Sequence, residues 1–500
     1  MEYVSTRDKS RKVSAAYAIA SGIAPDGGLY CPTSFPALTA EDWHALANLD
    51  YKGRSALILG KFLTDFSAEE LADYAAKAYA DDKFGGADTA PVVALDGGKH
   101  MLELWHGPTC AFKDMALQML PHLLTASLRK TGETRTACIL VATSGDTGKA
   151  ALAGFADAPG TGITVFYPEG KVSRVQELQM TTQTGDNVSV CGVRGNFDDA
   201  QSAVKRIFAD RELAERLAER GVVLSSANSI NVGRLVPQVV YYFAAYAQLL
   251  RAGAIEAGDE VEFCVPTGNF GDVLAGYYAK LLGLPVAKLI VASDKNNVLY
   301  DFLTTGVYDR KRPFFTTISP SMDILISSNL ERMLYYLSDG DCELVAALME
   351  QLATEGRYEV PAELLARIQE VFACGWANED EVRAAIGSCW RDHRYVIDPH
   401  TACGYHVLEQ VPAAPAARAR VLLSTASPYK FPRAVAESLG LDVPADDFAC
   451  MEVLAKATGT TPPVQLATLQ QAAVLHDDVV DVDGMSSYVE HACHAKLGQR

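Results

Sequence analysis

The sequence has little of what a nucleic-acid-binding or membrane-associated protein needs. Positive charge is scarce, because 44 Lys and Arg stand against 62 Asp and Glu and give a formal net charge of −18. A chain with this balance repels nucleic-acid phosphates and anionic lipid headgroups, so we expect neither as a partner. Any small anionic substrate must then be held by a few local cations and by helix N-termini.

Paired cysteines and long apolar runs are also missing. The 11 cysteines are odd in number and form no Cys-x-x-Cys pair, which favours reduced thiols in a cytoplasmic protein over a disulfide framework. His491, Cys493 and His494 lack further ligands at zinc-site spacing, so we predict no metal site. The longest apolar stretch, Val236 to Leu250, falls short of the roughly 20 residues of a membrane span and predicts a buried helix. The first residues show no signal peptide.

The apolar content is high enough to build a large core. Apolar residues make up 49% of the 500 residues, and the length favours about three domain-sized units. We expect a mainly helical N-terminal domain over residues 1–90, an α/β core over 91–450 and a helical extension over 451–500. Within the core, residues 339–394 are charged and predicted to be a mainly helical insertion.

Apolar runs alternate with helical segments through the predicted core. Val/Ile/Leu-rich runs of this kind, several followed by helices, indicate parallel strands covered on both faces and therefore an α/β fold. The runs are Cys138 to Ala142, Ile163 to Tyr167, Val188 to Val190, Val222 to Leu224, Val261 to Val265, Leu289 to Val291 and Val421 to Leu423.

Two of these runs end in polar, glycine-bearing turns that lead into helices, Thr143 to Gly148 and Thr267 to Asp272. Such turns place free N–H groups at the carboxyl edge of a parallel sheet, where ligands bind. Neither turn is a Walker loop or a dinucleotide fingerprint. For each turn taken alone, an ordinary capped or tight turn explains the residues as well as an anion site does.

A lysine stands at the start of another predicted helix. Lys113 follows the segment from Trp105 and precedes an amphipathic helix that runs from Met115 and is interrupted at Pro121. A helix N-terminus and neighbouring aromatic surface lower the pKa of an amine and favour a Schiff-base role. The alternative, which composition alone favours, is a solvated lysine paired with Asp114.

In order along the chain, these segments resemble the threonine synthases, a family of pyridoxal 5′-phosphate (PLP) enzymes. The resemblance implies the PLP-dependent tryptophan synthase β-like fold (fold type II), with two α/β domains and an N-terminal helical domain. The matching segments are Tyr3 to Arg7, Pro25 to Leu29, His106 to Asp114, Thr143 to Gly148, Gly170 to Ser173 with Gln176, Gln179 and Met180, Asn228 to Asn231 with Arg234, Pro266 to Gly271 and Thr425 to Phe431.

The resemblance also implies roles for individual residues. Lys113 is expected to carry PLP as a Schiff base, and Thr425 to contact the pyridine nitrogen, where a neutral hydroxyl favours elimination and replacement chemistry. The expected cradle of the PLP phosphate is Gly268, Asn269, Phe270 and Gly271. The expected contacts of the substrate carboxylate are Ser144, Gly145, Asp146 and Thr147, and those of the substrate phosphate are Lys171 and Arg234. Arg7 is either a further anion contact or a surface residue.

The implied reaction converts O-phospho-L-homoserine and water to L-threonine and phosphate, by elimination of the γ-phosphate and addition of water at Cβ, in a monomer or homodimer. Two alternatives stay open: a related PLP lyase that releases an oxoacid and ammonia, and a scaffold without catalysis. The sequence departs from the family pattern at three positions. Ser427 stands where histidine is frequent, Asp8 where glycine is common, and Asp146 where related enzymes carry asparagine.

Overall fold

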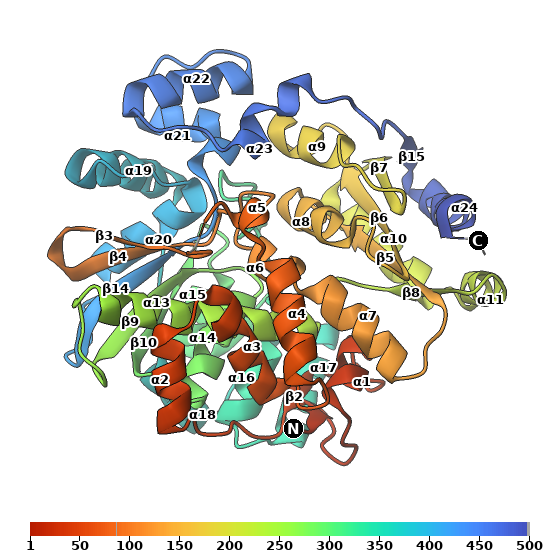
Figure 1. Ribbon diagram of the computed structural model, residues 1–500, viewed down its shortest axis with the longest axis horizontal. Helices are drawn as coiled ribbons and strands as arrows, with labels where there is room; N and C mark the ends of the chain where they lie inside the picture. The colour runs from red at the N-terminus through yellow and green to blue at the C-terminus, as the bar shows by residue number, and fades with distance from the viewer. Residues whose placement is uncertain (87, 498–500) are drawn as a thin grey trace.

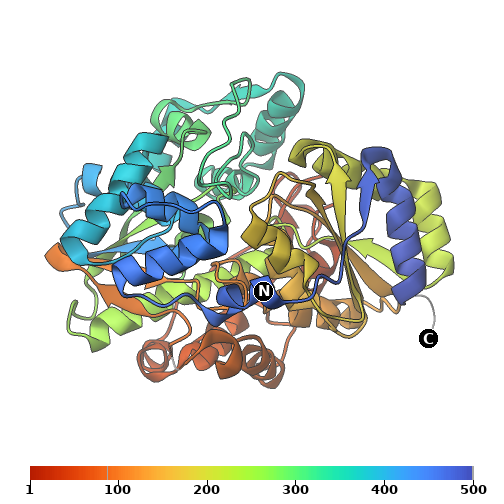
Figure 2. The same cartoon turned by 90° about the horizontal axis from the view of Figure 1, so that it is seen from above.

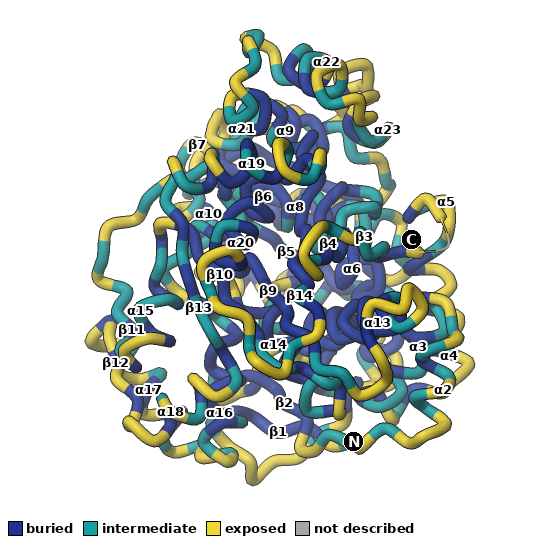
Figure 3. Tube along the Cα trace, turned by 90° about the vertical axis from the view of Figure 1, so that its left-hand side faces the viewer, coloured by how far each residue is buried: buried dark blue, intermediate teal, exposed yellow. Residues whose placement is uncertain are grey.

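The computed structural model describes residues 1–86 and 88–497 and contains two parallel sheets in separate lobes, each covered by helices (Figure 1). Seen from above, the lobe of the smaller sheet lies beside the lobe of the larger one (Figure 2). The strands are largely buried, while exposed residues lie mainly in outer helices and loops (Figure 3). The fold is therefore the α/β fold predicted from the alternation of apolar runs and helices.

The larger sheet has six strands in the order β13-β10-β9-β14-β4-β3. All neighbours are parallel except β3, which runs antiparallel to β4 at one edge. Its strands are β13 (Phe372–Trp376), β10 (Val286–Ser293), β9 (Glu260–Pro266), β14 (Ala417–Ser424), β4 (Lys99–Glu103) and β3 (Val92–Ala94).

The smaller sheet has five parallel strands in the order β15-β7-β6-β5-β8. Every residue of β6 is buried, as expected for a central strand with both faces covered. The strands are β15 (Val479–Asp481), β7 (Val188–Arg194), β6 (Thr161–Pro168), β5 (Thr136–Ala142) and β8 (Val222–Ser225). All seven apolar runs predicted to be strands lie in these two sheets.

Helices and a short hairpin form the N-terminal part of the chain. The hairpin pairs β1 (Tyr3–Ser5) with β2 (Tyr30–Pro32). The helices are α1 (Ala15–Ser21), α2 (Ala40–Asn48), α3 (Tyr51–Phe62), α4 (Ala68–Ala78) and α5 (Asp81–Phe84). The predicted buried helix is α13 (Val239–Arg251), which packs against α2 and α3.

The remaining helices connect or cover the strands. Around the smaller sheet they are α6 (Asp114–Leu117), α7 (Leu120–Lys130), α8 (Asp146–Phe155), α9 (Arg174–Thr181), α10 (Phe197–Ala209), α11 (Arg211–Glu219) and α12 (Val232–Leu235). Around the larger sheet they are α14 (Gly271–Leu281), α15 (Val298–Thr305), α16 (Leu330–Leu337), α17 (Cys342–Thr354), α18 (Ala362–Val371), α19 (Glu379–His393), α20 (Pro399–Gln410) and α21 (Pro432–Ser438). The chain continues through α22 (Asp447–Thr458) and α23 (Val464–Ala467), and the last element of the described residues is α24 (Met485–Leu497).

The structure differs from the expected elements at several places, and the strands β1, β2, β3 and β4 correspond to no predicted run. Residues 339–394 hold α17, α18 and α19, but also β12 (Arg357–Glu359), which pairs with β11 (Val307–Asp309), and β13, the edge strand of the larger sheet. The C-terminal extension contributes β15 to the smaller sheet as well as helices. The helix break expected at Pro121 comes earlier, at Gln118 and Met119, because proline is tolerated in the first turn of α7.

Within residues 1–86 and 88–497, no helix has both the length and the apolar character to cross a membrane.

Candidate active site

Four strand ends bring the predicted site residues together. β4, β14 and β9 are neighbours in the larger sheet, and β5 supplies the fourth end from the smaller one. The segment after β4 is tied to the segment after β14, since Phe112 N donates to Thr425 O at 2.8 Å and Ser427 N donates to Cys110 O at 3.0 Å. These bonds place Lys113 beside Thr425, at the carboxyl edge where parallel sheets bind ligands.

Lys113 is a buried amine without a carboxylate partner among the described residues. It sits at the N-cap of α6, is 9% exposed, and has its Nζ 4.8 Å from the centre of the Phe112 ring. Burial is the main cause that lowers its pKa to about 8. Asp114 instead accepts hydrogen bonds from the N–H and the hydroxyl of Thr109, both at 2.8 Å. The interpretation of Lys113 as a solvated lysine paired with Asp114 is therefore wrong.

The turn after β9, Gly268 to Gly271, is the predicted anion cradle and lies at the N-terminus of α14. Ser327 Oγ donates to Gly268 O at 2.8 Å, and Asn329 donates to Asn269 O from both its backbone N and its side chain. A Cβ on Gly268 would lie 3.0 Å from the backbone oxygen of Ser321, so this position requires glycine. The first N–H groups of a helix have no intrahelical partner and bind anions.

The left-handed residue of this turn is not a glycine. Phe270 has φ of 60°, whereas φ of Gly271 is not positive. The Phe270 side chain is fully buried, with its ring centre 5.5 Å from that of Phe372. This packing offsets a backbone conformation that costs about 1–2 kcal/mol for a residue with a side chain.

The turn after β5 opens α8 in a similar way. Thr143 Oγ1 accepts hydrogen bonds from Gly145 N and Gly148 N at 3.0 and 2.9 Å, so the capped-turn interpretation holds for Thr143. Gly145 has φ of 138°, and a Cβ there would lie 2.5 Å from the Gln176 side chain. Gly145 at the N-cap of α8 has no side chain, and Thr143 accepts only from the third N–H of the helix, that of Gly148. The N–H groups of Asp146 and Thr147 are thus available to an anion.

The side chain of Asp146 is engaged in an ion pair. Its Oδ1 lies 2.8 Å from Lys430 Nζ and accepts a hydrogen bond from Gln176 Nε2 at 3.0 Å, and its Oδ2 accepts one from Ser321 Oγ at 3.2 Å. Lys430 and its neighbours hold the pKa of Asp146 well below its usual range, against the opposing effect of burial. The carboxylate is thus ionised and fully occupied, and only the backbone of Asp146 suits an anionic substrate.

Arg234 carries a second buried positive charge. It is 6% exposed, and its side chain donates to Ala227 O at 2.9 Å and to no carboxylate within the described part of the chain. Burial lowers its pKa to about 10, and its charge acts on the pKa of Lys113. A guanidinium held in this way is suited to an incoming phosphate or carboxylate.

Comparison with known proteins agrees with this geometry. The family model described as Threonine synthase N terminus matches residues 2–79, Pyridoxal-phosphate dependent enzyme matches residues 101–425, and Threonine synthase, C-terminal matches residues 401–480. Threonine synthase of Pseudomonas aeruginosa is 38% identical over 438 residues, which cover 87% of this chain and 90% of that protein. The chain belongs to the threonine synthase family.

Other members of the family are similar over nearly the whole chain. The crystal structure of PLP-bound threonine synthase from Brucella melitensis has a TM-score of 0.88 and 37% identity, and covers 98% of this chain and 99% of that one. Threonine synthase from yeast also has a TM-score of 0.88, at 32% identity, covering 99% of this chain and 98% of that one. Human threonine synthase-like 1 is 38% identical over 489 residues. That alignment covers 94% of this chain but only 65% of the human protein.

The residues at the strand ends fit PLP, the cofactor of this family. Lys113 supplies a buried amine of lowered pKa, and the Gly268–Gly271 cradle supplies N–H groups at a helix N-terminus. Thr425 is 3% exposed, and its hydroxyl makes no hydrogen bond to the described residues, so it can serve a ring nitrogen. Ser427 caps the following turn by accepting from Tyr429 N at 3.3 Å.

The other two candidate cations, Lys171 and Arg7, make no hydrogen bond or ion pair with these residues. Lys171 is exposed on the loop between β6 and α9, and its side chain makes no hydrogen bond or ion pair to the described residues. Arg7 forms a two-pronged ion pair with Glu331, at 2.8 and 2.9 Å. The interpretation of Arg7 as an anion contact is therefore replaced by a structural one, in which it ties the N-terminal arm to α16.

Sequence reasoning missed several polar residues of the site. Lys430 lies inside the matching segment from Thr425 to Phe431, and its charge next to a predicted cofactor contact was the available signal. Ser321 and Asn329 lie in a long loop without an apolar period, and their approach to Gly268 and Asn269 depends on tertiary structure.

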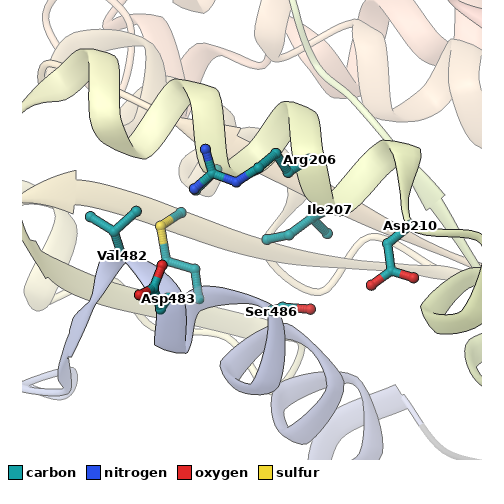
Figure 4. A pocket seen from close by; sticks show the side chains of 8 residues that line it. Arg206, Ile207, Asp210, Val482, Asp483 and Ser486 are labelled. Carbon is teal, nitrogen blue, oxygen red and sulfur yellow. The ribbon is translucent and has the colours of Figure 1, made fainter.

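A separate hollow of about 160 Å³ lies between α10 and the start of α24. Figure 4 shows Arg206, Ile207 and Asp210 on one side and Val482, Asp483 and Ser486 on the other. It involves none of the four strand ends, so it is distinct from the candidate active site.

Proposed function

We propose that this chain is a threonine synthase, which converts O-phospho-L-homoserine and water to L-threonine and phosphate. The observation that carries the proposal is the buried Lys113 amine, set among two helix N-termini and the Arg234 guanidinium, which has no carboxylate partner among the described residues. A substrate with a carboxylate at one end and a phosphate at the other matches these separate anion sites.

PLP, when bound, supplies an electron sink for the charge that develops next to the substrate nitrogen. Lys113 moves the protons: with a pKa of about 8, a useful fraction of its amine is neutral near neutral pH and can take the Cα proton and later return a proton. The neutral hydroxyl of Thr425 does not hold the ring nitrogen protonated as a carboxylate would, which supports elimination over transamination.

The chain's own residues bind the two ends of the substrate. We assign the carboxylate to the turn of Ser144, Gly145, Asp146 and Thr147, through N–H groups at the start of α8 and through hydroxyls. We assign the phosphate to Arg234. Lys171 is a proposed second phosphate contact, on the exposed loop that precedes α9, whose Gln176 packs against Gly145. These local cations oppose the net charge of −18.

The test is stoichiometry with O-phospho-L-homoserine. Purified PLP-loaded protein is expected to release phosphate and threonine in equal amounts, and the Lys113→Ala variant neither. Phosphate with 2-oxobutanoate and ammonia in place of threonine would establish the lyase alternative instead. Absence of turnover by the loaded wild type would reject both enzyme functions and leave the scaffold without catalysis.

A further inference from the structure

Lys430 is a completely buried lysine whose charge is fully paired. Its side chain is 0% exposed, and its ammonium contacts Asp146 Oδ1 at 2.8 Å and donates to Thr109 O at 3.0 Å. Lysine is almost never fully buried unless it is paired, and a buried ion pair is maintained only where further hydrogen bonds satisfy both partners. The pair therefore requires a reason beyond stability.

The ion pair of Asp146 with Lys430 is one end of a series of hydrogen bonds that extends away from the site. Ser321 donates its hydroxyl to Asp146 and its N–H to His400 Nε2 at 3.1 Å. Nε2 is thus an acceptor, so Nδ1 carries the proton and donates to Asp398 at 2.7 Å. Each link has one possible direction, which orients Asp146 without ambiguity.

The same series of hydrogen bonds leads back to Thr425, the predicted contact of the PLP ring nitrogen. Asp398 accepts a hydrogen bond from the hydroxyl of Thr401, and the oxygen of that hydroxyl accepts from Thr425 N at 3.1 Å. Asp146 belongs to the smaller sheet's lobe, whereas Lys430, Ser321 and His400 belong to segments of the larger sheet's lobe. The ion pair thus joins the substrate-binding turn to the sheet that positions Lys113.

We propose that Asp146 and Lys430 are a positioning pair for Lys113. Their ion pair fixes the turn of residues 144–147 against the larger sheet and keeps one carboxylate and one ammonium beside the Lys113 amine. The inference rests on the proposed function for its substrate, but it can be tested without turnover.

The charges around Lys113 come from several elements and oppose one another. Burial is the largest cause of its lowered pKa; Asp146 and Asp272 raise the pKa, and Arg234 and Lys430 lower it. Further charged groups surround the pair. Lys149 and Lys430 each act on the pKa of Asp114, and His400 is connected to Asp146 through Ser321.

Asp146 and Lys430 must therefore shift the pKa of Lys113 in opposite directions. Asp146→Asn removes a charge that raises the pKa of Lys113, so the pKa falls further. Lys430→Met removes a charge that lowers it, so the pKa rises. The double variant removes both and returns the pKa close to that of the wild type. A purely structural role would instead change the two single variants in the same direction.

The experiment measures how the Lys113 amine reacts in apo-protein. PLP is added at a series of pH values, its attachment is trapped with borohydride, and mass spectrometry locates it on Lys113. We expect the wild-type rate to rise with a midpoint near pH 8, as the pKa of about 8 requires. The midpoint should move by about one unit to lower pH in Asp146→Asn and by a similar amount to higher pH in Lys430→Met.

Two further variants keep the test decisive. Lys149→Met removes a buried lysine that is not among the main charges acting on the pKa of Lys113, and should move the midpoint less than either single variant does. Lys430→Arg keeps the charge and should leave the midpoint in place, whereas a role that depends on the shape of the lysine side chain would move it. Shifts of both single variants in one direction, or no shift in either, would overturn the proposal. Failure of the proposed function would show differently, as normal attachment of PLP without turnover by the wild type.

Discussion

At the scale of single residues, three buried cations lie at the candidate site of this acidic chain. Lys113, Arg234 and Lys430 are 9%, 6% and 0% exposed. Only Lys430 has a carboxylate partner among the described residues. Unpaired cations at this depth cost free energy of folding, so their presence favours a function that uses them.

Arg234→Gln tests the proposed phosphate contact. The variant removes the charge but keeps a hydrogen-bonding side chain, so we expect the KM for O-phospho-L-homoserine to rise by about 10- to 100-fold, because a charge-assisted bond contributes about 1.5–3 kcal/mol. PLP affinity should change little, and the melting temperature should not fall, because the variant removes a buried charge whose pKa burial lowers. Steady-state kinetics measure the KM, and Arg206→Gln, at an exposed position, is the matched control. An unchanged KM would remove Arg234 from the substrate site.

Lys113→Met tests the cost of the buried amine. Because the pKa of Lys113 falls from 10.5 to about 8 on folding, the unfolded chain binds more protons between these values, and wild-type stability rises with pH across that window. We therefore expect the inactive variant to be more stable than wild-type apo-protein by about 1–3 kcal/mol at pH 7. The difference in the free energy of unfolding between the variant and the wild type should narrow from pH 8 to pH 10. Denaturant unfolding of both apo-proteins measures it, and a less stable variant at pH 7 would contradict the burial argument.

At the scale of elements, the predictable parts are those with local signals. Most interior strands were predicted because strands buried on both faces need continuous Val, Ile and Leu, as in β6 and β9. The interior strand β4 was missed, because its sequence begins with Lys99 and His100 and ends with Glu103 and shows no continuous apolar run. The short edge strands β13 and β15 were missed, since a few half-exposed residues carry no such run. The turns were located, but the left-handed position at Phe270 was not, because the packing of its ring permits it. The ion pair of Asp146 with Lys430 joins distant segments and has no local signal.

The C-terminal helix α24 is predicted to be an integral part of the smaller sheet's lobe. Met485, Val489 and Cys493 are at most 1% exposed and belong to a core that includes Cys138 and Phe166. Met485→Ala should therefore lower the free energy of unfolding by about 2–4 kcal/mol. The exposed neighbour His491→Ala should have no measurable effect. Denaturant unfolding compares the two, and equal stability of both variants would show that α24 is dispensable.

At the scale of the whole molecule, the N-terminal arm is connected to the cofactor cradle. Thr6 and Arg7 bind Glu331 on α16. The next residue, Arg332, is fully buried and donates to Tyr30 O at 2.9 Å, to Ile230 O and to Asn329 Oδ1. The Arg332 guanidinium therefore joins β2, the turn before α12 and the residue before α16. Its planar group of donors suits three fixed acceptors.

Arg332→Met is expected to weaken PLP binding without touching the cofactor. Asn329, which Arg332 holds, donates from its backbone and side chain to Asn269 O in the cradle. Loss of the guanidinium leaves these acceptors unsatisfied and releases Asn329, so we expect the Kd for PLP to rise about tenfold or more, equivalent to about 1.4 kcal/mol. Fluorescence titration of apo-protein measures the Kd, and the surface variant Arg367→Met is the control, because that arginine pairs only with exposed Asp339. An unchanged Kd with a lowered melting temperature would mean that Arg332 stabilises the arm alone, and that the cradle is set by the loop from Ser321 to Asn329.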